Sequence, residues 1–179
     1  MKEFVTKHST AFIVGALLIF IGGAAYFGMD ALKRQKIKAA IKKIVDDGKF
    51  DGSFYWPWSG PITSPFGMRT DPFNGSQKMH NGIDIDGETG DPIHATAPGI
   101  VYEVATGPEA GKRIRIEHPG GITSHYFHLS AQLVKDGDQV DENTVIGLMG
   151  ATGKRVTGSH LHFGMKQNGS WIDPASLLT

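Results

Sequence analysis

The sequence predicts a mainly β protein, an antiparallel β-sheet sandwich-like domain preceded by an N-terminal transmembrane helix. From residue 62 onward, short apolar runs of strand length are separated by clusters of Gly, Pro or Asp, and none has a convincing helical period. These runs span residues 99–105, 113–117, 124–129, 144–149 and 161–166. The first 29 residues have the opposite character, because they contain one long uncharged apolar stretch.

That stretch runs from Ser9 to Met29 without a charged residue. As a helix it would span ~31 Å, close to the thickness of a hydrocarbon core. A cleaved signal peptide is the alternative, with a small-residue exit at Gly22–Ala25. We favour a retained anchor over residues 1–29, because the run is long for a signal peptide and Tyr26 and Phe27 continue it past that exit.

The next two segments connect the anchor to the domain. Residues 30–49 are predicted to form a basic helix with one apolar stripe, either a solvated stalk or a helix that lies on anionic lipid headgroups. Residues 50–60 contain Gly, Ser and Pro and are predicted to be a linker. Its aromatic side chains are expected either to pack on the domain, which we favour, or to contact glycan. The remaining residues, 61–179, form the predicted domain.

Composition excludes several classes of function. The chain has no cysteine, which removes disulfides and thiol catalysis. The formal net charge is zero, but residues 51–179 carry nine Lys and Arg against fourteen Asp and Glu. This mildly acidic balance argues against a nucleic-acid groove in the domain.

Two short strings carry metal-ligating side chains, His80-Asn-Gly-Ile-Asp84 and His160-Leu-His162. Residues two apart in an extended strand share a face, so His160 and His162 are expected to point the same way. The same rule would align His80 with Asp84, with Gly82 leaving room for an ion or substrate between them. Histidine and carboxylate ligands without cysteine suit one catalytic zinc ion with three protein ligands and one spare histidine.

A third string, Ser124-His-Tyr-Phe-His-Leu129, is predicted to be a strand. In a regular strand Tyr126 and His128 share one face, whereas His125 and Phe127 share the other. Only one of the two histidines can then face the metal. We choose His128, because the face that it shares with Tyr126 gives a polar pair.

Several ordered motifs between residues 61 and 174 resemble those of the lysostaphin-type zinc metallopeptidases, which cut the peptide bridges of bacterial peptidoglycan. The motifs are Ile62-Thr-Ser-Pro-Phe-Gly-Met-Arg69, the His80 string, Tyr126-Phe-His-Leu129, Gly137-Asp-Gln-Val140 and Gly158-Ser-His-Leu-His-Phe163. This resemblance implies a peptidase domain with a substrate groove, one Zn²⁺ ion, and a peptidoglycan peptide as substrate. It implies His80, Asp84 and His162 as zinc ligands.

The resemblance also implies His128 and His160 as the catalytic pair beside the metal. One of them would deprotonate water and the other would stabilise the oxyanion, and either assignment agrees with the sequence. The implied protein is a membrane-anchored endopeptidase whose domain faces peptidoglycan in the periplasm or cell envelope. The alternative is a non-catalytic domain that binds peptidoglycan or activates other hydrolases, and lost ligand residues would mark it.

Charge around the anchor conflicts with that location. Residues 1–50 carry nine Lys and Arg against four Asp and Glu, and most of the basic residues follow the apolar stretch. The positive-inside rule would then keep the domain in the cytoplasm, away from peptidoglycan. Either the rule fails for this chain, or the membrane is an unusual one, as it would be for a wall-opening part of a phage virion with a membrane or of a secretion apparatus. Such a larger assembly is therefore a further expected partner, beside membrane lipid.

Overall fold

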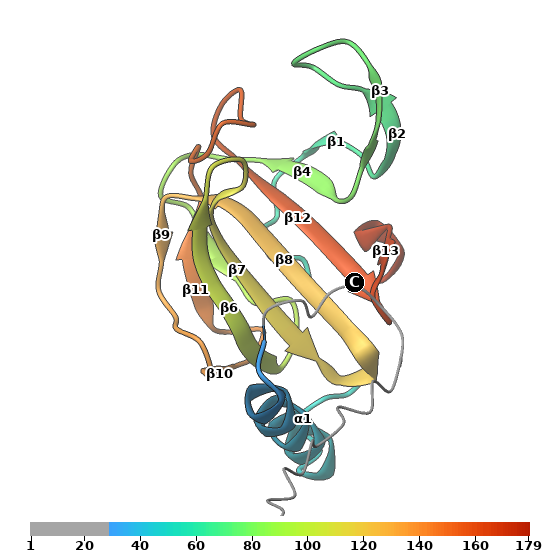
Figure 1. Cartoon of the computed structure of the whole chain (residues 1–179), viewed down its shortest axis with the longest axis vertical. Coiled ribbons are helices and arrows are strands. Elements are labelled where there is room, and N and C mark those ends of the chain that lie inside the picture. The colour runs from blue at the N-terminus through green and yellow to red at the C-terminus, as the bar shows by residue number, and fades with distance from the viewer. Residues whose placement is uncertain (1–28) are drawn as a thin grey trace, which may run out of the picture.

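The computed structural model describes residues 29–179 (Figure 1). The described chain contains one α-helix, many short strands and two 3₁₀ turns, so the predicted mainly β, antiparallel fold is confirmed. In chain order the elements are α1 (Ala31–Asp46), β1 (Ile62–Ser64), β2 (Gly67–Thr70), β3 (Gln77–His80), β4 (Ile83–Asp86), β5 (Pro92–His94), β6 (Gly99–Gly107), β7 (Gly111–His118), η1 (Pro119–Gly121), β8 (Ile122–Leu129), β9 (Ala131–Gln132), β10 (Gln139–Val140), β11 (Val145–Leu148), β12 (His160–Gln167), β13 (Ser170–Ile172) and η2 (Pro174–Ser176).

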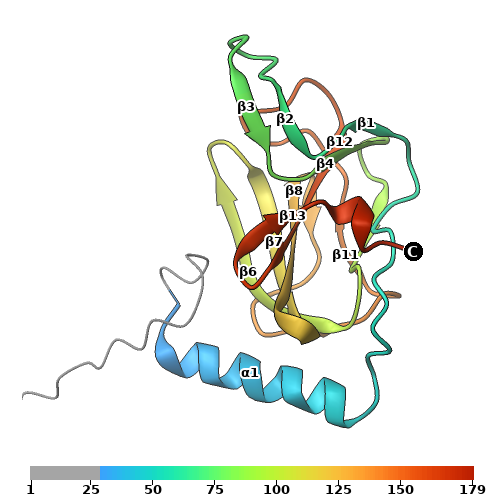
Figure 2. The same cartoon turned by 90° about the vertical axis from the view of Figure 1, so that its right-hand side faces the viewer.

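The strands form three antiparallel sheets. The largest has the order β1-β4-β12-β8-β7-β6-β10, with β13 paired to the other end of β12. A smaller sheet has the order β5-β11-β9, and β2 and β3 form a separate hairpin. Figure 2 shows this hairpin projecting from the end of the molecule opposite α1.

The hydrophobic core lies on one face of the large sheet. Ile114 and Ile116 alternate with polar residues along β7, as a half-buried strand requires, and both are fully buried. They belong to one core cluster with Ile93 of β5 and Ile146 of β11, so the two sheets pack face to face. The opposite face of the large sheet carries the polar side chains, including Arg115.

Helix α1 covers one end of that opposite face (Figures 1 and 2). The Asp30 side chain accepts a hydrogen bond from Lys33 N at the start of the helix, and Gly48 adopts a positive φ just after its end. Ile37 and Ile44 are buried against Ile100 and Tyr102. The middle of the apolar stripe therefore packs on the domain, whereas Leu32 and Val45 stay exposed. This corrects the expectation of a solvated stalk, and a contact of the helix with lipid headgroups stays a prediction.

Residues 50–60 also contact the domain closely. Phe54 is buried in the main core, and Tyr55 N donates a hydrogen bond to Thr96 O at 2.7 Å. The indole of Trp58 donates to Asp86 O at 2.9 Å. The expected packing is confirmed for Phe54, Trp56 and Trp58, whereas Tyr55 is exposed.

The apolar stretch that predicts a membrane anchor lies, apart from Met29, outside the described residues. Within residues 29–179 no helix is both long and apolar enough to cross a membrane. The anchor therefore stays a prediction from sequence.

Candidate metal centre

Three strands bring His80, Asp84 and His162 together. His80 is the last residue of β3, Asp84 lies in β4, and His162 lies beside Asp84 in the neighbouring strand β12. Asp84 and His162 are direct partners across the two strands. One ligand atom from each of the three residues lies within 4.8 Å of the other two, as the resemblance implies for a common ion.

The ligand atoms of these three residues lie close to one another. His162 Nδ1 lies 2.8 Å from Asp84 Oδ1, and His80 Nε2 lies 3.2 Å from the same oxygen. The two ring nitrogens are 3.1 Å apart. Two nitrogens and one carboxylate oxygen thus converge on one point.

The chemistry of these atoms fits a divalent metal. His80 Nδ1 lies 2.8 Å from Pro65 O, and a carbonyl can only accept, so Nδ1 carries the proton. In the neutral ring His80 Nε2 then has a lone pair directed at Asp84 and His162. Lone pairs from two imidazoles and one carboxylate are a typical ligand set of catalytic zinc, which leaves a position open for water.

The surroundings of Asp84 favour its charged form. Burial alone would raise the pKa of Asp84, but the His162 and His80 rings in their protonated forms outweigh burial and hold this pKa well below its usual range. With the rings neutral, a divalent cation bound at the same point would favour the charged carboxylate in the same way. Arg69 Nη1 lies 3.4 Å from Asp84 Oδ2 and donates a hydrogen bond to Ser64 Oγ at 2.6 Å. Arg69 thus orients the other carboxylate oxygen, a contact typical of residues that support metal ligands.

His128 reaches this site through an irregularity in β8. Its φ is +66°, a conformation that L-residues rarely adopt. The pairing of β7 with β8 runs Lys112 to Leu129 and Ile114 to Tyr126, so β8 contains one extra residue between these pairs. This is a β-bulge, and it redirects the His128 side chain.

The bulge corrects the argument by which His128 was chosen. Tyr126 is fully buried in the core on the other face, where its hydroxyl accepts hydrogen bonds from Thr96 N and Ser124 Oγ. Phe127, expected on the face away from the metal, instead stacks on His162. His128 and Phe127 therefore both face the candidate centre, although they are adjacent in sequence.

His128 and His160 form a matched pair beside the three converging residues. Their ring centroids are 5.0 Å apart, and His160 Nε2 lies 3.9 Å from Asp84 Oδ1. His128 Nδ1 lies 2.8 Å from Thr152 O, and His160 Nδ1 lies 3.0 Å from Gly158 O. In both rings the backbone carbonyl places the proton on Nδ1, which leaves Nε2 as the atom that can accept or exchange a proton.

Burial also affects the protonation of His128. It lowers the pKa of His128 to about 4, so this imidazole is neutral at physiological pH. A neutral imidazole with a free Nε2 is the form that a general base requires.

Gly82 allows close packing between β12 and the segment before β4, a role that the sequence did not indicate. A Cβ at this position would lie 2.5 Å from Phe163 O and 2.9 Å from His162 Nε2. The space beside Gly82 is therefore filled by β12 and the His162 ring, and not by an ion or substrate as expected. The glycine allows β12 to approach closely enough for His162 to meet Asp84.

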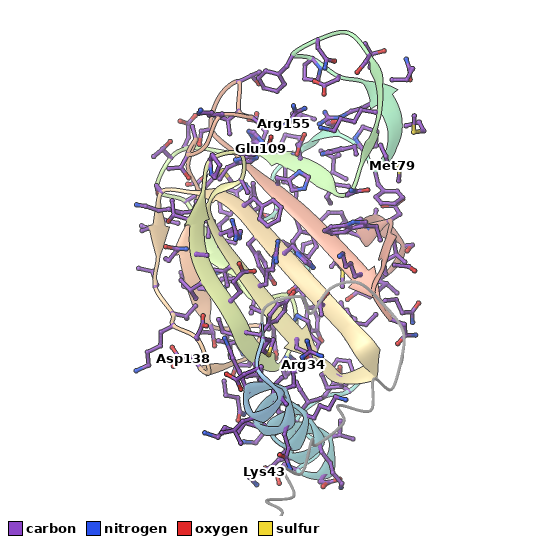
Figure 3. All side chains as sticks on the ribbon, in the orientation of Figure 1. Arg34, Lys43, Met79, Glu109, Asp138 and Arg155 are labelled. Carbon is purple, nitrogen blue, oxygen red and sulfur yellow. The ribbon has the colours of Figure 1, made fainter. Side chains whose placement is uncertain are left out.

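A groove of about 260 Å³ contains all five of these residues. One wall is the β2–β3 hairpin with its turn, and the other is formed by the β6–β7 turn and the loop before β12. In Figure 3, Arg155 and Glu109 lie to one side of β3, which carries Met79. Side chains of Phe127 and Trp171 form part of the lining between the walls.

Several of these lining residues were not expected from sequence. Phe127 was assigned to the wrong face, and Arg155 and Trp171 belong to no motif that we recognised. Arg69 ends the first of the motifs, and its acidic partner, Asp84, lies inside the candidate centre.

Comparison with known proteins identifies the family. The model of peptidase family M23 matches residues 78–174, more than half of the chain. The chain belongs to peptidase family M23. The match covers all five of the residues that the lysostaphin-type resemblance implied, and that resemblance is confirmed at the level of the family.

Relatives of this M23 domain include the DD-carboxypeptidase/endopeptidase Mpg of Neisseria meningitidis serogroup B. It is 37% identical over 116 residues, which cover 65% of this chain and 26% of Mpg. The peptidoglycan DD-endopeptidase ShyB of Vibrio cholerae is 43% identical over 103 residues, covering 57% of this chain and 24% of ShyB. The chain thus matches about a quarter of the length of these relatives.

A zinc-containing peptidase from Vibrio cholerae is similar in structure, with a TM-score of 0.64 and 36% identity. The similarity covers 68% of this chain and 39% of the Vibrio protein.

Proposed function

We propose that this chain is a zinc metalloendopeptidase that hydrolyses peptide cross-links of bacterial peptidoglycan. The observation that carries the proposal is the convergence of His80, Asp84 and His162 on one point, beside a pair of histidines with free Nε2 atoms. This is the full set of groups that metal-assisted hydrolysis of a peptide bond needs.

His80, Asp84 and His162 would hold the metal. When bound there, zinc supplies a water of lowered pKa and a Lewis acid for the scissile carbonyl. His80 keeps its ligand orientation through the hydrogen bond to Pro65 O, and Arg69 holds the far oxygen of Asp84.

His128 and His160 would accept and donate protons during hydrolysis. Each has Nδ1 tied to a carbonyl, so each can accept a proton at Nε2 and later donate it. A protonated imidazole of the pair would also stabilise the charge on the tetrahedral oxyanion. Both residues have Nδ1 bound to a carbonyl and Nε2 free, so either one can be the base and the other the oxyanion donor.

The relatives support the choice of substrate. Their names describe DD-carboxypeptidase/endopeptidase and peptidoglycan DD-endopeptidase activities, so we propose a bond formed by a D-amino acid in a peptidoglycan cross-link. The groove that contains the candidate centre lies between two walls, which would hold a peptide across the five residues.

We also propose that residues 1–29 anchor the enzyme in a membrane. The uncharged stretch ends at Met29, and α1 begins at Ala31 and packs on the domain through Ile37 and Ile44. The enzyme would then act on wall close to the membrane, and a virion or secretion apparatus stays the proposed context for the basic residues after the span. Carbonate extraction of membranes containing the full chain would test the anchor, which predicts retention in the pellet.

A non-catalytic role in binding peptidoglycan or activating hydrolases is the alternative. It is disfavoured because no ligand or proton-transfer residue is missing from the site. Incubation of purified peptidoglycan with the full chain, followed by mass spectrometry of released muropeptides, separates the two roles. The proposal predicts un-cross-linked products that require zinc and are lost in His160→Ala. Binding to the wall without any product would support the alternative.

A further inference from the structure

The two walls of the groove are joined by an ion pair. Arg155 Nη2 lies 2.7 Å from Asp71 Oδ2, although the residues are 84 positions apart. Asp71 belongs to the turn between β2 and β3, and Arg155 belongs to the loop that leads into β12. Both residues line the groove that contains the candidate centre.

Asp71 is built into its wall. Its side chain is 1% exposed, and it accepts a hydrogen bond from Phe73 N at 2.9 Å within the turn. Its backbone N–H donates to Ser76 O, and its backbone carbonyl accepts from Gly75 N. The Phe73 N–H and then the Arg155 guanidinium lower the pKa of Asp71, so the carboxylate stays charged.

Arg155 makes a second contact with the same turn. Its guanidinium lies 4.9 Å from the centroid of the Phe73 ring, within the range of a cation–π interaction. The Phe73 side chain is 47% exposed, so this contact lies at the outer surface of the wall. Arg155 thus binds the opposite wall through one buried carboxylate and one exposed ring, and we call Arg155, Asp71 and Phe73 the clasp.

The loop that carries Arg155 is held to its own wall on either side of this residue. Lys154 N donates to Pro108 O in the β6–β7 turn, and His160 N donates to Gly150 O. The side chain of Arg155 reaches from this loop to the other wall. An opening of the clasp therefore requires only that the side chain and the residues beside it move.

The clasp has a consequence for a polymeric substrate. Because all three residues of the clasp line the groove, a peptide that leaves on their side would pass beneath the clasp or displace it. A linear peptide with a free end can be threaded beneath a closed bridge. A cross-link cannot, because both of its ends are attached to glycan strands.

We propose that the clasp selects between these substrates, and that it must open before a cross-linked peptide can occupy the groove. This inference rests on the proposed endopeptidase function. Arg155 and Asp71 would then determine specificity without taking part in the chemistry, in the manner of the lids that admit substrate to other enzymes.

A reversible lock tests the proposal. The natural chain has no cysteine, so Phe73→Cys combined with Arg155→Cys introduces the only two thiols, one in each wall. A bifunctional thiol reagent with an internal disulfide would link the walls, and a reductant would release them. Rates are measured with the full chain on intact peptidoglycan and on a linear free-ended peptide that contains the same scissile bond. The matched control is Phe73→Cys alone, treated with the same reagent.

The proposal predicts that locking lowers the ratio of wall hydrolysis to linear-peptide hydrolysis at least about tenfold, and that reduction restores it. Arg155→Met, which removes the ion pair, is expected to raise the same ratio about two- to fivefold, whereas Lys154→Met next to it leaves the ratio unchanged. A locked protein with an unchanged ratio would overturn the clasp proposal alone. Absence of hydrolysis of both substrates by the unmodified chain would overturn the proposed function, and this proposal with it.

Discussion

The ring of Phe127 lies almost parallel to that of His162, with 5.3 Å between the centroids and 12° between the planes. The contact joins β8 to β12 at the candidate metal centre. Phe127 and the next residue, His128, both face this centre. Phe127 faces the centre through the regular alternation of β8, and the bulge at the next residue turns His128 toward the same place.

The positive φ of His128 predicts an unusual order of stabilities. At an ordinary strand position alanine is more stable than glycine, but alanine is strained at a φ of +66°. We therefore expect His128→Gly to be more stable than His128→Ala by about 1 kcal/mol in urea unfolding. Phe127→Gly and Phe127→Ala form the control pair, for which the ordinary order is expected. If the alanine variant were the more stable one at both positions, the positive φ assigned to His128 would be contradicted.

Gly82 predicts a steric effect on the centre. Gly82→Ala would press on Phe163 O and the His162 ring, so we expect a loss of about 1–3 kcal/mol in unfolding free energy and weaker zinc binding. Gly158→Ala is the matched control, because a Cβ there meets nothing within 4 Å. Zinc affinity is measured by competition with a chelating dye. Equal affinity in the two variants would contradict the close approach of β12.

The site shows how far sequence could lead. His160 and His162 share a face because β12 is a regular strand, and the period of two was enough to predict this. The same rule led us to select His128, but the reason was wrong, because Tyr126 and His128 do not share a face. A β-bulge shifts the alternation between them, and no sequence pattern indicated this bulge. The ion pair between Asp71 and Arg155 had no local signal either, since its two residues meet only after the sheet has formed.

Helix α1 was misjudged for a different reason. An apolar stripe flanked by lysines is compatible with a membrane surface and equally with a protein surface. The deciding feature is the apolar end of the sheet at Ile100 and Tyr102, which α1 buries. The sequence does not indicate which face of the sheet needs such a cover.

The docking of α1 makes its own prediction. Ile44 is 1% exposed whereas the adjacent Val45 is 51% exposed. We expect Ile44→Asp to lower the unfolding free energy by about 2–4 kcal/mol and Val45→Asp to change it little. Urea unfolding followed by tryptophan fluorescence measures both. Similar small effects at the two positions would mean that the helix does not pack on the sheet.

His118 predicts a loss of stability in acid. It is buried, lies 2.7 Å from Ser124 Oγ and 3.0 Å from Pro98 O, and burial lowers its pKa to about 4. Because the unfolded chain binds this proton first, the stability that His118 contributes is complete above about pH 6.5 and is lost as the pH falls toward 4, by about 3 kcal/mol from this residue. The decline should be smaller by that amount in His118→Asn. An identical decline in the two proteins would contradict the assignment.

The most direct test of the account is a zinc titration of the metal-free full chain during peptidoglycan hydrolysis. If His80, Asp84 and His162 hold one catalytic ion, activity rises in proportion to zinc and levels off at one equivalent, and Asp84→Asn shows neither tight binding nor activity. Hydrolysis that persists without metal, or one tightly bound equivalent that yields no hydrolysis, would contradict the account.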